Sequence, residues 1–165
     1  MNLNPFALIE RVRDHSPTAA NALLNQLVPR IIPLANGLGV RVREVTDRRA
    51  VLTMPLKRRT KNHVGSIYIG AQMTLADLTA GVLVFSKFPP GPFGALIKRV
   101  EADFLAKAKG TLRCVCELPD ETNGTFEAVR TSPEGKAEAW LPVELTGPDG
   151  EVVTRMRILG AIKRF

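Results

Sequence analysis

The spacing of apolar residues near the start of the chain predicts two helices. Apolar residues recur at helical intervals after Asn4-Pro5 and again after Ser16-Pro17. Both dipeptides are typical of an N-cap followed by proline at the first helical position. Pro29 and Pro33 are expected to break or kink the chain after the second helix, and Asn36-Gly37 indicates a helix stop or a turn.

Further along the chain the pattern is mostly that of strands. Apolar residues alternate with polar ones, and clusters of Gly, Pro, Asp and Ser separate the runs. Gly147 to Gly150 predicts a hairpin turn, and a short helix is expected over 120–130. The predicted strands lie at 40–43, 51–54, 94–106, 112–118, 137–145 and 152–161.

One long apolar segment, residues 67–85, separates the first two strands from the rest, and Asp77 is its only formally charged residue. Its length is enough for a membrane helix. Because Gln72, Thr74, Asp77 and two glycines interrupt it, we expect a buried core helix and no membrane span. A carboxylate in such a helix costs free energy unless it is paired, hydrogen-bonded or protonated. Asp77 is therefore either well satisfied by neighbours or functional.

The order of these elements predicts an α+β fold in which an antiparallel sheet curls around one central helix. A chain of 165 residues is long enough for one domain with a substantial core. We expect a single domain over 1–165, with a helical extension at 1–36 and the core at 37–165. So few strands cannot enclose the helix, so a second subunit is expected to complete the core.

The net charge of +7 favours an anionic partner, although a solvated basic surface is an equal alternative. The chain has one Trp, one Tyr and no recognisable RNA- or DNA-binding motif. Base-stacking platforms are therefore scarce, and no nucleic-acid partner is expected. The N-terminal residues lack the pattern of a secretory signal or a transit peptide, which indicates a cytoplasmic protein.

The two cysteines, Cys114 and Cys116, alternate with Val115 in a predicted strand. They share one face of that strand and are poorly placed to bridge to each other. No second pair and no histidine lie nearby, so we expect two buried thiols in a reducing compartment, without a metal site or a cofactor.

The segment from Asn62 to Asp77 resembles a motif of hotdog-fold acyl-CoA thioesterases of the phenylacetic-acid type. That motif has an Asn, then His-Gly-Gly, then a helix with Leu-Ala-Asp. Here Asn62 matches the Asn, Ile69-Gly70 the paired glycines, and Leu75-Ala76-Asp77 the helical acid. Tyr68 stands where the family has histidine. The segment is more similar still to an uncharacterised hotdog group related to the C-terminal part of some acetyltransferase fusions. The resemblance extends over most of residues 37–162.

The resemblance implies hydrolysis of an acyl-CoA thioester. Asp77 of one subunit would act as general base or nucleophile on a thioester at the helix start of the other. The amides of Ile69 and Gly70 would form the oxyanion hole. Asn62 would orient the water or the thioester, and Thr74 would assist Asp77.

Substrate binding is expected from the loop before the helix and from two basic clusters. Surface Arg and Lys suit the phosphates of CoA, which is part of the substrate. Plainer roles stay open: an Asx-turn for Asn62, an ordinary loop position for His63 and packing for Tyr68. The predicted substrate-binding residues are His63, Gly65, Tyr68, Arg58, Arg59, Lys61, Lys107 and Lys109.

A second interpretation is a hotdog module that binds acyl-CoA or a fatty acyl chain without catalysis. Tyr68 and Ile69 favour this module, whereas Asp77 and Asn62 favour the enzyme. A hydratase ranks last, since the required pairing of an acid with a histidine is not found. For either leading interpretation we expect a homodimer or a dimer of dimers.

Overall fold

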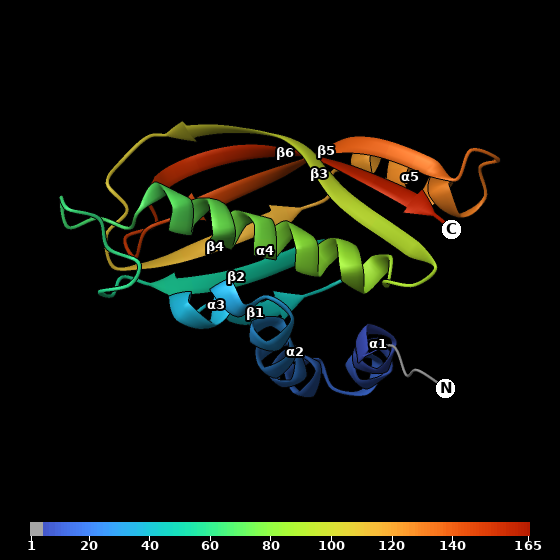
Figure 1. The fold of residues 1–165 in the computed structure, drawn as a ribbon, viewed down its shortest axis with the longest axis horizontal. Coiled ribbons are helices and arrows are strands. Elements are labelled where there is room, and N and C mark those ends of the chain that lie inside the picture. Colours follow the sequence, from blue (N-terminus) through green and yellow to red (C-terminus); the bar gives the residue numbers. More distant parts are fainter. Residues whose placement is uncertain (1–4) are drawn as a thin grey trace.

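The computed structural model describes residues 5–165, apart from the side chain of Ala7, and shows an antiparallel sheet curled around one long helix (Figure 1). The predicted α+β architecture is confirmed. The helix, α4 (Ile69–Lys87), follows the second strand as expected. The six strands are β1 (Arg41–Val45), β2 (Arg49–Pro55), β3 (Phe93–Phe104), β4 (Thr111–Glu117), β5 (Lys136–Thr146) and β6 (Val152–Arg164).

The strands lie in the order β1-β2-β4-β5-β6-β3, and every neighbouring pair is antiparallel. The chain leaves β2 near one edge, passes through α4 and returns in β3 at the opposite edge. The short helix expected at 120–130 is present as α5 (Asp120–Glu127) and a 3-10 turn (Ala128–Arg130). It places Phe126 in the core.

The core lies between α4 and the concave face of the sheet. Leu75 and Leu83 of α4 are fully buried, as are Cys114 and Cys116 of β4, which confirms that the two cysteines share the inner face. Burial raises the pKa of the Cys114 thiol to about 12. By length and composition α4 is the one helix within residues 5–165 that could cross a membrane, and most of it is buried in this core.

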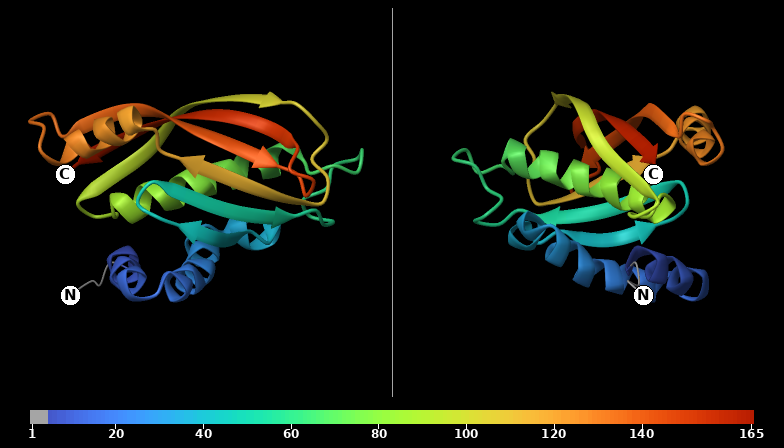
Figure 2. Two further views of the ribbon diagram at one scale, coloured as in Figure 1. Left: turned by 180° about the vertical axis from the view of Figure 1, so that it is seen from behind. Right: turned by 45° about the vertical axis from the view of Figure 1, so that its right-hand side comes forward.

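The three N-terminal helices, α1 (Pro5–His15), α2 (Pro17–Ile31) and α3 (Pro33–Leu38), lie at the β1 edge of the sheet (Figures 1 and 2). Ser16 caps α2 as predicted, accepting a hydrogen bond from the backbone N–H of Ala19 at 3.3 Å. The cap predicted at Asn4 lies outside the described residues.

Two predictions about the stops in this region are wrong. Pro29 does not end α2, which continues to Ile31: the missing N–H of proline removes one helical bond, to the carbonyl of Asn25, and beyond it the N–H of Ile32 still donates to the carbonyl of Val28. Asn36-Gly37 does not end a helix but lies within α3. The stop is Gly39, whose φ of 70° gives the left-handed conformation that glycine adopts without strain.

The two edges of the sheet differ in how they are covered. Asn25 of α2 both donates to the carbonyl of Val42 and accepts from its N–H, at 3.0 and 2.7 Å. Asn21 donates to the carbonyl of Arg43 at 2.9 Å. Side chains of α2 therefore occupy the β1 edge. No comparable bond from residues 5–165 reaches the outer edge of β3, where the Leu96 side chain is 76% exposed.

A buried hydrogen-bonded pair joins α4 to the sheet. Thr154 of β6 donates to Oε1 of Gln72 at 2.6 Å, and Nε2 of Gln72 donates to the carbonyl of Ile67 at 3.0 Å. Both side chains are buried, so each group needs its partner. The pair fixes the start of α4 against the sheet.

We expect Thr154→Val to lower the free energy of unfolding by roughly 1–3 kcal/mol, since it leaves Oε1 of Gln72 buried without a donor. Urea unfolding followed by circular dichroism measures this. Thr154→Ser, which keeps the hydroxyl, is the matched control. A Val variant that unfolds at the same urea concentration as the Ser variant would show that the bond contributes nothing.

Candidate active site

The side chain of Asp77 is exposed, unlike most of α4. Solvent reaches its side chain, so the expectation that the whole helix is buried is wrong at this position. Its carboxylate has no hydrogen bond or ion pair with any residue of 5–165. Apolar walls remove part of its hydration, and this desolvation raises the pKa of Asp77 above the usual 3.8. Asp77 was expected to be either satisfied by neighbouring groups or functional. Within the described chain no neighbouring group satisfies it.

Two cavities meet at Asp77, between α4 and the strands β3 and β6. One has a volume of about 380 Å³ and extends along the second half of α4. The other has about 220 Å³ and lies toward the start of the helix, beside Met73 and Thr74. Because both are lined by Asp77, Ile97 and Ile158, they form one groove with the acid at its middle.

The start of α4 presents backbone N–H groups. Tyr68 is the N-cap, and its carbonyl accepts from the N–H groups of Ala71 and Gln72. The N–H groups of Ile69 and Gly70 have no acceptor within residues 5–165. Such groups carry the positive end of the helix dipole. This is the arrangement that the predicted oxyanion hole requires.

The Tyr68 side chain lies across Gly70 and is 56% exposed. A Cβ added at Gly70 would come within 2.8 Å of Cε1 of Tyr68. A side chain at this position would therefore displace the ring from the helix start.

Asn62 forms an Asx-turn in the loop before α4. Its Oδ1 accepts from the N–H groups of Val64 and Ser66, at 3.1 and 2.9 Å. Its Nδ2 has no acceptor within the described chain. Gly65, with φ of 78°, completes the turn. The structural role predicted as an alternative for Asn62 is therefore present, and the amide nitrogen stays available for a ligand.

A separate cavity of about 510 Å³ lies at the start of α4. It brings together five of the predicted site residues, which are Asn62, His63, Tyr68, Ile69 and Lys107. Thr74 lies outside it, because its hydroxyl donates to the carbonyl of Gly70 at 2.9 Å and its side chain lines the small cavity beside Asp77.

One chain does not bring the two halves of the predicted site together. The cavity at the start of α4 shares no lining residue with the groove at Asp77. Asp77 follows Ile69 by eight residues, which is about 12 Å along a helix axis. Proton transfer needs about 3 Å. A thioester held by the Ile69 and Gly70 amides is therefore out of reach of Asp77 of the same chain.

The predicted CoA-binding cations are exposed, and none forms an ion pair with an acid of residues 5–165. Lys107 lines the cavity at the helix start, whereas Arg59 extends toward Gly37 of α3. The structure does not place Arg58, Lys61 or Lys109 in that cavity. Within residues 5–165 there is also no group of three or more His, Cys, Asp or Glu side chains that could hold a metal ion.

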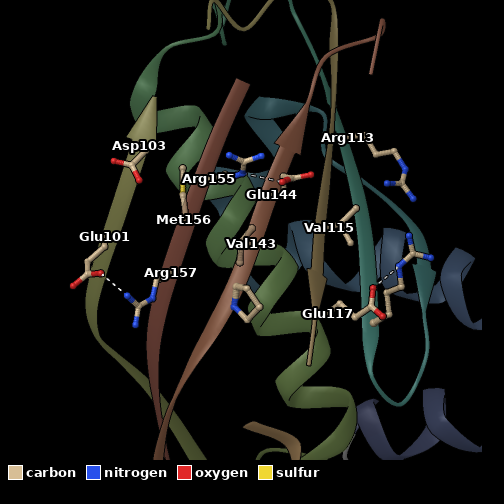
Figure 3. A pocket seen from close by; sticks show the side chains of 12 residues that line it. Glu101, Asp103, Arg113, Val115, Glu117, Val143, Glu144, Arg155, Met156 and Arg157 are labelled. Carbon is tan, nitrogen blue, oxygen red and sulfur yellow. Dashed lines mark hydrogen bonds and ion pairs between the residues drawn. The ribbon is translucent and has the colours of Figure 1, made fainter. Parts of the chain in front are cut away.

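The largest hollow, about 620 Å³, lies on the outer face of the sheet and contains none of the predicted site residues (Figure 3). Its charges are largely paired across strands, with Arg155 on Glu144 at 3.2 Å and Arg157 on Glu101 at 3.4 Å. Opposite charges on neighbouring strands stabilise a sheet. This hollow is therefore a charged sheet surface, on the opposite face of the sheet from α4 and Asp77.

Gln72 was not among the predicted site residues, although its hydrogen bond to the carbonyl of Ile67 fixes the start of α4. A polar residue in the apolar run was the available signal. The cavity-lining position Phe126 carried no signal, because a cavity wall and a core have the same composition.

The fold and its relatives define the class of protein. A Pseudomonas aeruginosa protein described as a probable thioesterase of unknown function shares 30% identity and a TM-score of 0.78, over 87% of this chain and 95% of that one. Two more distant solved thioesterases share the fold. The one from Staphylococcus aureus has 17% identity and a TM-score of 0.66, over 79% of this chain and 98% of that one. The one from Haemophilus influenzae has 13% identity and a TM-score of 0.70, over 87% of this chain and 90% of that one. The chain has the hotdog fold of the thioesterase superfamily.

Within that superfamily the particular family is also shown. Residues 20–161 match the family described as a domain of unknown function, DUF4442, and the chain belongs to it. No curated protein matches the chain.

Proposed function

We propose that this protein is an acyl-CoA thioesterase in which Asp77 acts as a general base or a nucleophile. The observation that carries the proposal is the Asp77 carboxylate itself, which is unpaired, partly desolvated and at the middle of an apolar groove. A carboxylate whose pKa is raised is a stronger base, and such groups concentrate at active sites.

The other half of the site comes from a second subunit. Since Asp77 is out of reach of the start of its own α4, the amides of Ile69 and Gly70 and Nδ2 of Asn62 would act on the thioester from the partner. The β3 edge supports a homodimer, because it is long, apolar at Leu96 and Ile97, and uncovered. Ile97 lines both cavities beside Asp77, so a strand added to β3 would bring a second subunit next to the acid.

A spacing in one relative supports the same pairing of residues. Two solved Staphylococcus aureus variants replace a glutamine and a glutamate by alanine. These two positions have the same separation in sequence as Asn62 and Asp77. An amide side chain and a carboxylate therefore recur at matching spacing on the same fold.

In the proposed reaction Asp77 removes a proton from water, and the water oxygen attacks the thioester carbon. The oxyanion accepts hydrogen bonds from the Ile69 and Gly70 amides. The carbon–sulfur bond then breaks, the proton passes to the CoA thiolate, and a carboxylic acid and CoA leave. If Asp77 attacks directly, water hydrolyses the resulting anhydride. Lys107 and the neighbouring cations bind the CoA phosphates. The reaction uses no cofactor, since CoA is part of the substrate, and we place it in the cytoplasm.

Thiol release from a panel of acyl-CoAs, from acetyl to stearoyl and including phenylacetyl, tests the proposal. Release that depends on enzyme concentration supports it. If the folded protein releases no thiol from any member, it is not an acyl-CoA thioesterase.

The second candidate is a non-catalytic module that binds acyl-CoA. One observation favours it: the exposed Tyr68 ring lies across Gly70, close to the amides that catalysis would use. Calorimetric binding of acyl-CoA without thiol release would establish this function.

Asn62→Asp separates the two roles of Asn62. The carboxylate keeps an acceptor for the Val64 and Ser66 N–H groups, so the loop is expected to keep its turn. The substitution removes the Nδ2 donor, so we expect kcat/KM to fall by about 10²–10³-fold, as when one hydrogen-bond donor of an oxyanion hole is removed. Steady-state kinetics, with thermal unfolding as the control for folding, measures this. Unchanged kcat/KM in a folded variant would limit Asn62 to its turn.

A further inference from the structure

The larger cavity beside Asp77 contains one polar side chain, that of Asp77 itself. Every other side chain that lines it is apolar, and the contributing residues come from α4, β3, β5, β6 and α5. A hydroxyl or an amine placed there would lose its hydration without gaining a hydrogen bond. The lining therefore selects a ligand part that is purely hydrocarbon.

Gly81 leaves open space at the wall of this cavity. It follows Asp77 by four residues, so the two lie on the same face of α4, one turn apart. A Cβ added at Gly81 meets no atom within 4 Å. Glycine weakens a helix relative to alanine, and close packing within this chain does not require it. The missing side chain instead enlarges the cavity next to the acid.

The far end of the cavity is closed by buried side chains. Leu141 and Phe126 lie there, and a Cβ added at Gly160 would come within 2.8 Å of Leu141 Cδ1 and 3.5 Å of Phe126 Cζ. Gly160 thus lets these two side chains pack as the floor. The volume of about 380 Å³ lies near the lower end of the range of about 300–1,000 Å³ for small-molecule pockets. Such a space suits a medium-length chain better than a long one.

We propose that this cavity binds the acyl group of the substrate, that the group is an unsubstituted aliphatic chain of medium length, and that Gly81 sets the length accepted. The proposal rests on the proposed thioesterase function. It places the acyl chain along α4, from the thioester carbon beside Asp77 toward Phe126.

Gly81→Leu tests the assignment of length, and Gly124→Leu is its matched control. Leucine favours a helix, so neither change opposes folding. Gly124 lies in α5, is exposed and also has open space around its Cα. We expect Gly81→Leu to lower the ratio of kcat/KM for octanoyl-CoA over acetyl-CoA at least tenfold, since each methylene in an apolar pocket contributes roughly 10–200-fold. Gly124→Leu should leave that ratio unchanged.

A uniform loss for both substrates, or an unchanged ratio in Gly81→Leu, would overturn the assignment of Gly81. If the wild type releases no thiol from any substrate, the proposed hydrolysis fails. The cavity is then tested by calorimetry with octyl-CoA and ethyl-CoA thioethers. A preference for octyl-CoA that Gly81→Leu removes supports the cavity assignment, and equal affinities in the wild type overturn it.

The absence of polar lining is tested with ω-hydroxyoctanoyl-CoA, which places a hydroxyl at the far end of the cavity. We expect kcat/KM to be roughly tenfold to a hundredfold lower than for octanoyl-CoA in the wild type. Equal values for the two substrates would mean that the chain end stays in water and does not enter the cavity.

Discussion

Replacing Asp77 by asparagine is expected to lower kcat by about 10²–10⁴-fold, the usual contribution of a general base. The variant keeps the size and shape of the side chain but cannot accept the proton of water. Since the groove offers no other titratable group beside the acid, no neighbour replaces it. Thiol release from octanoyl-CoA measures the effect, and circular dichroism checks the fold.

The same substitution is expected to raise stability at neutral pH. The pKa of Asp77 is raised in the folded chain, so the unfolded chain releases the proton at lower pH. As pH rises from below 3.8 through the folded pKa, the folded state loses stability relative to the unfolded state. Asparagine removes this loss. Thermal unfolding of both proteins across about pH 3 to 8 should show curves that separate as pH rises.

The activity of the wild type should follow the same ionisation. In the proposed mechanism the basic form of Asp77 is the active one, so kcat/KM should rise with pH and level off above the folded pKa of this group. The midpoint should exceed the ordinary aspartate value of 3.8. Wild-type rates in Asp77→Asn would remove Asp77 from the mechanism.

Two impaired variants, Asp77→Asn and Asn62→Asp, are expected to restore activity when they share one dimer. Asp77→Asn keeps Asn62, and Asn62→Asp keeps Asp77, so a mixed dimer contains one complete site if each site draws on both chains. In the proposed mechanism the spacing of about 12 Å between Ile69 and Asp77 calls for this arrangement. The experiment unfolds the two variants together in urea, refolds them and measures thiol release.

Each variant taken alone through the same cycle is the control. Activity that stays at the level of the separate variants would place all catalytic groups in one chain. Light scattering at micromolar concentration gives the companion measurement. A monomer mass there would contradict the proposed second subunit, whereas a dimer or tetramer mass is expected from the open β3 edge.

The fold was accessible from the sequence because its periodicities are strong. The apolar run that became α4 and the alternation that became β5 and β6 predicted both the elements and their order. The stop at Asn36-Gly37 failed because Gly39 takes the left-handed position, and two candidate glycines so close together cannot be ranked by composition alone.

The site was only partly accessible. The acid at Asp77 was conspicuous because it is the only charge in an apolar segment. Its separation from the cavity at the start of α4 depends on helix rise and strand order. The role of Gln72 depends on Thr154, which is 82 positions away, and a contact between such distant residues leaves no local pattern.

Because Cys114 and Cys116 are deeply buried, their reactivity reports local unfolding of the sheet. With the pKa of both thiols raised by burial, almost no thiolate forms while the sheet is intact, so a thiol-reactive dye finds nothing to label. This burial has two experimental consequences. Released CoA can be measured with such a dye because the protein's own thiols add almost nothing to the signal. The slow labelling that does occur then measures how often β4 separates from α4.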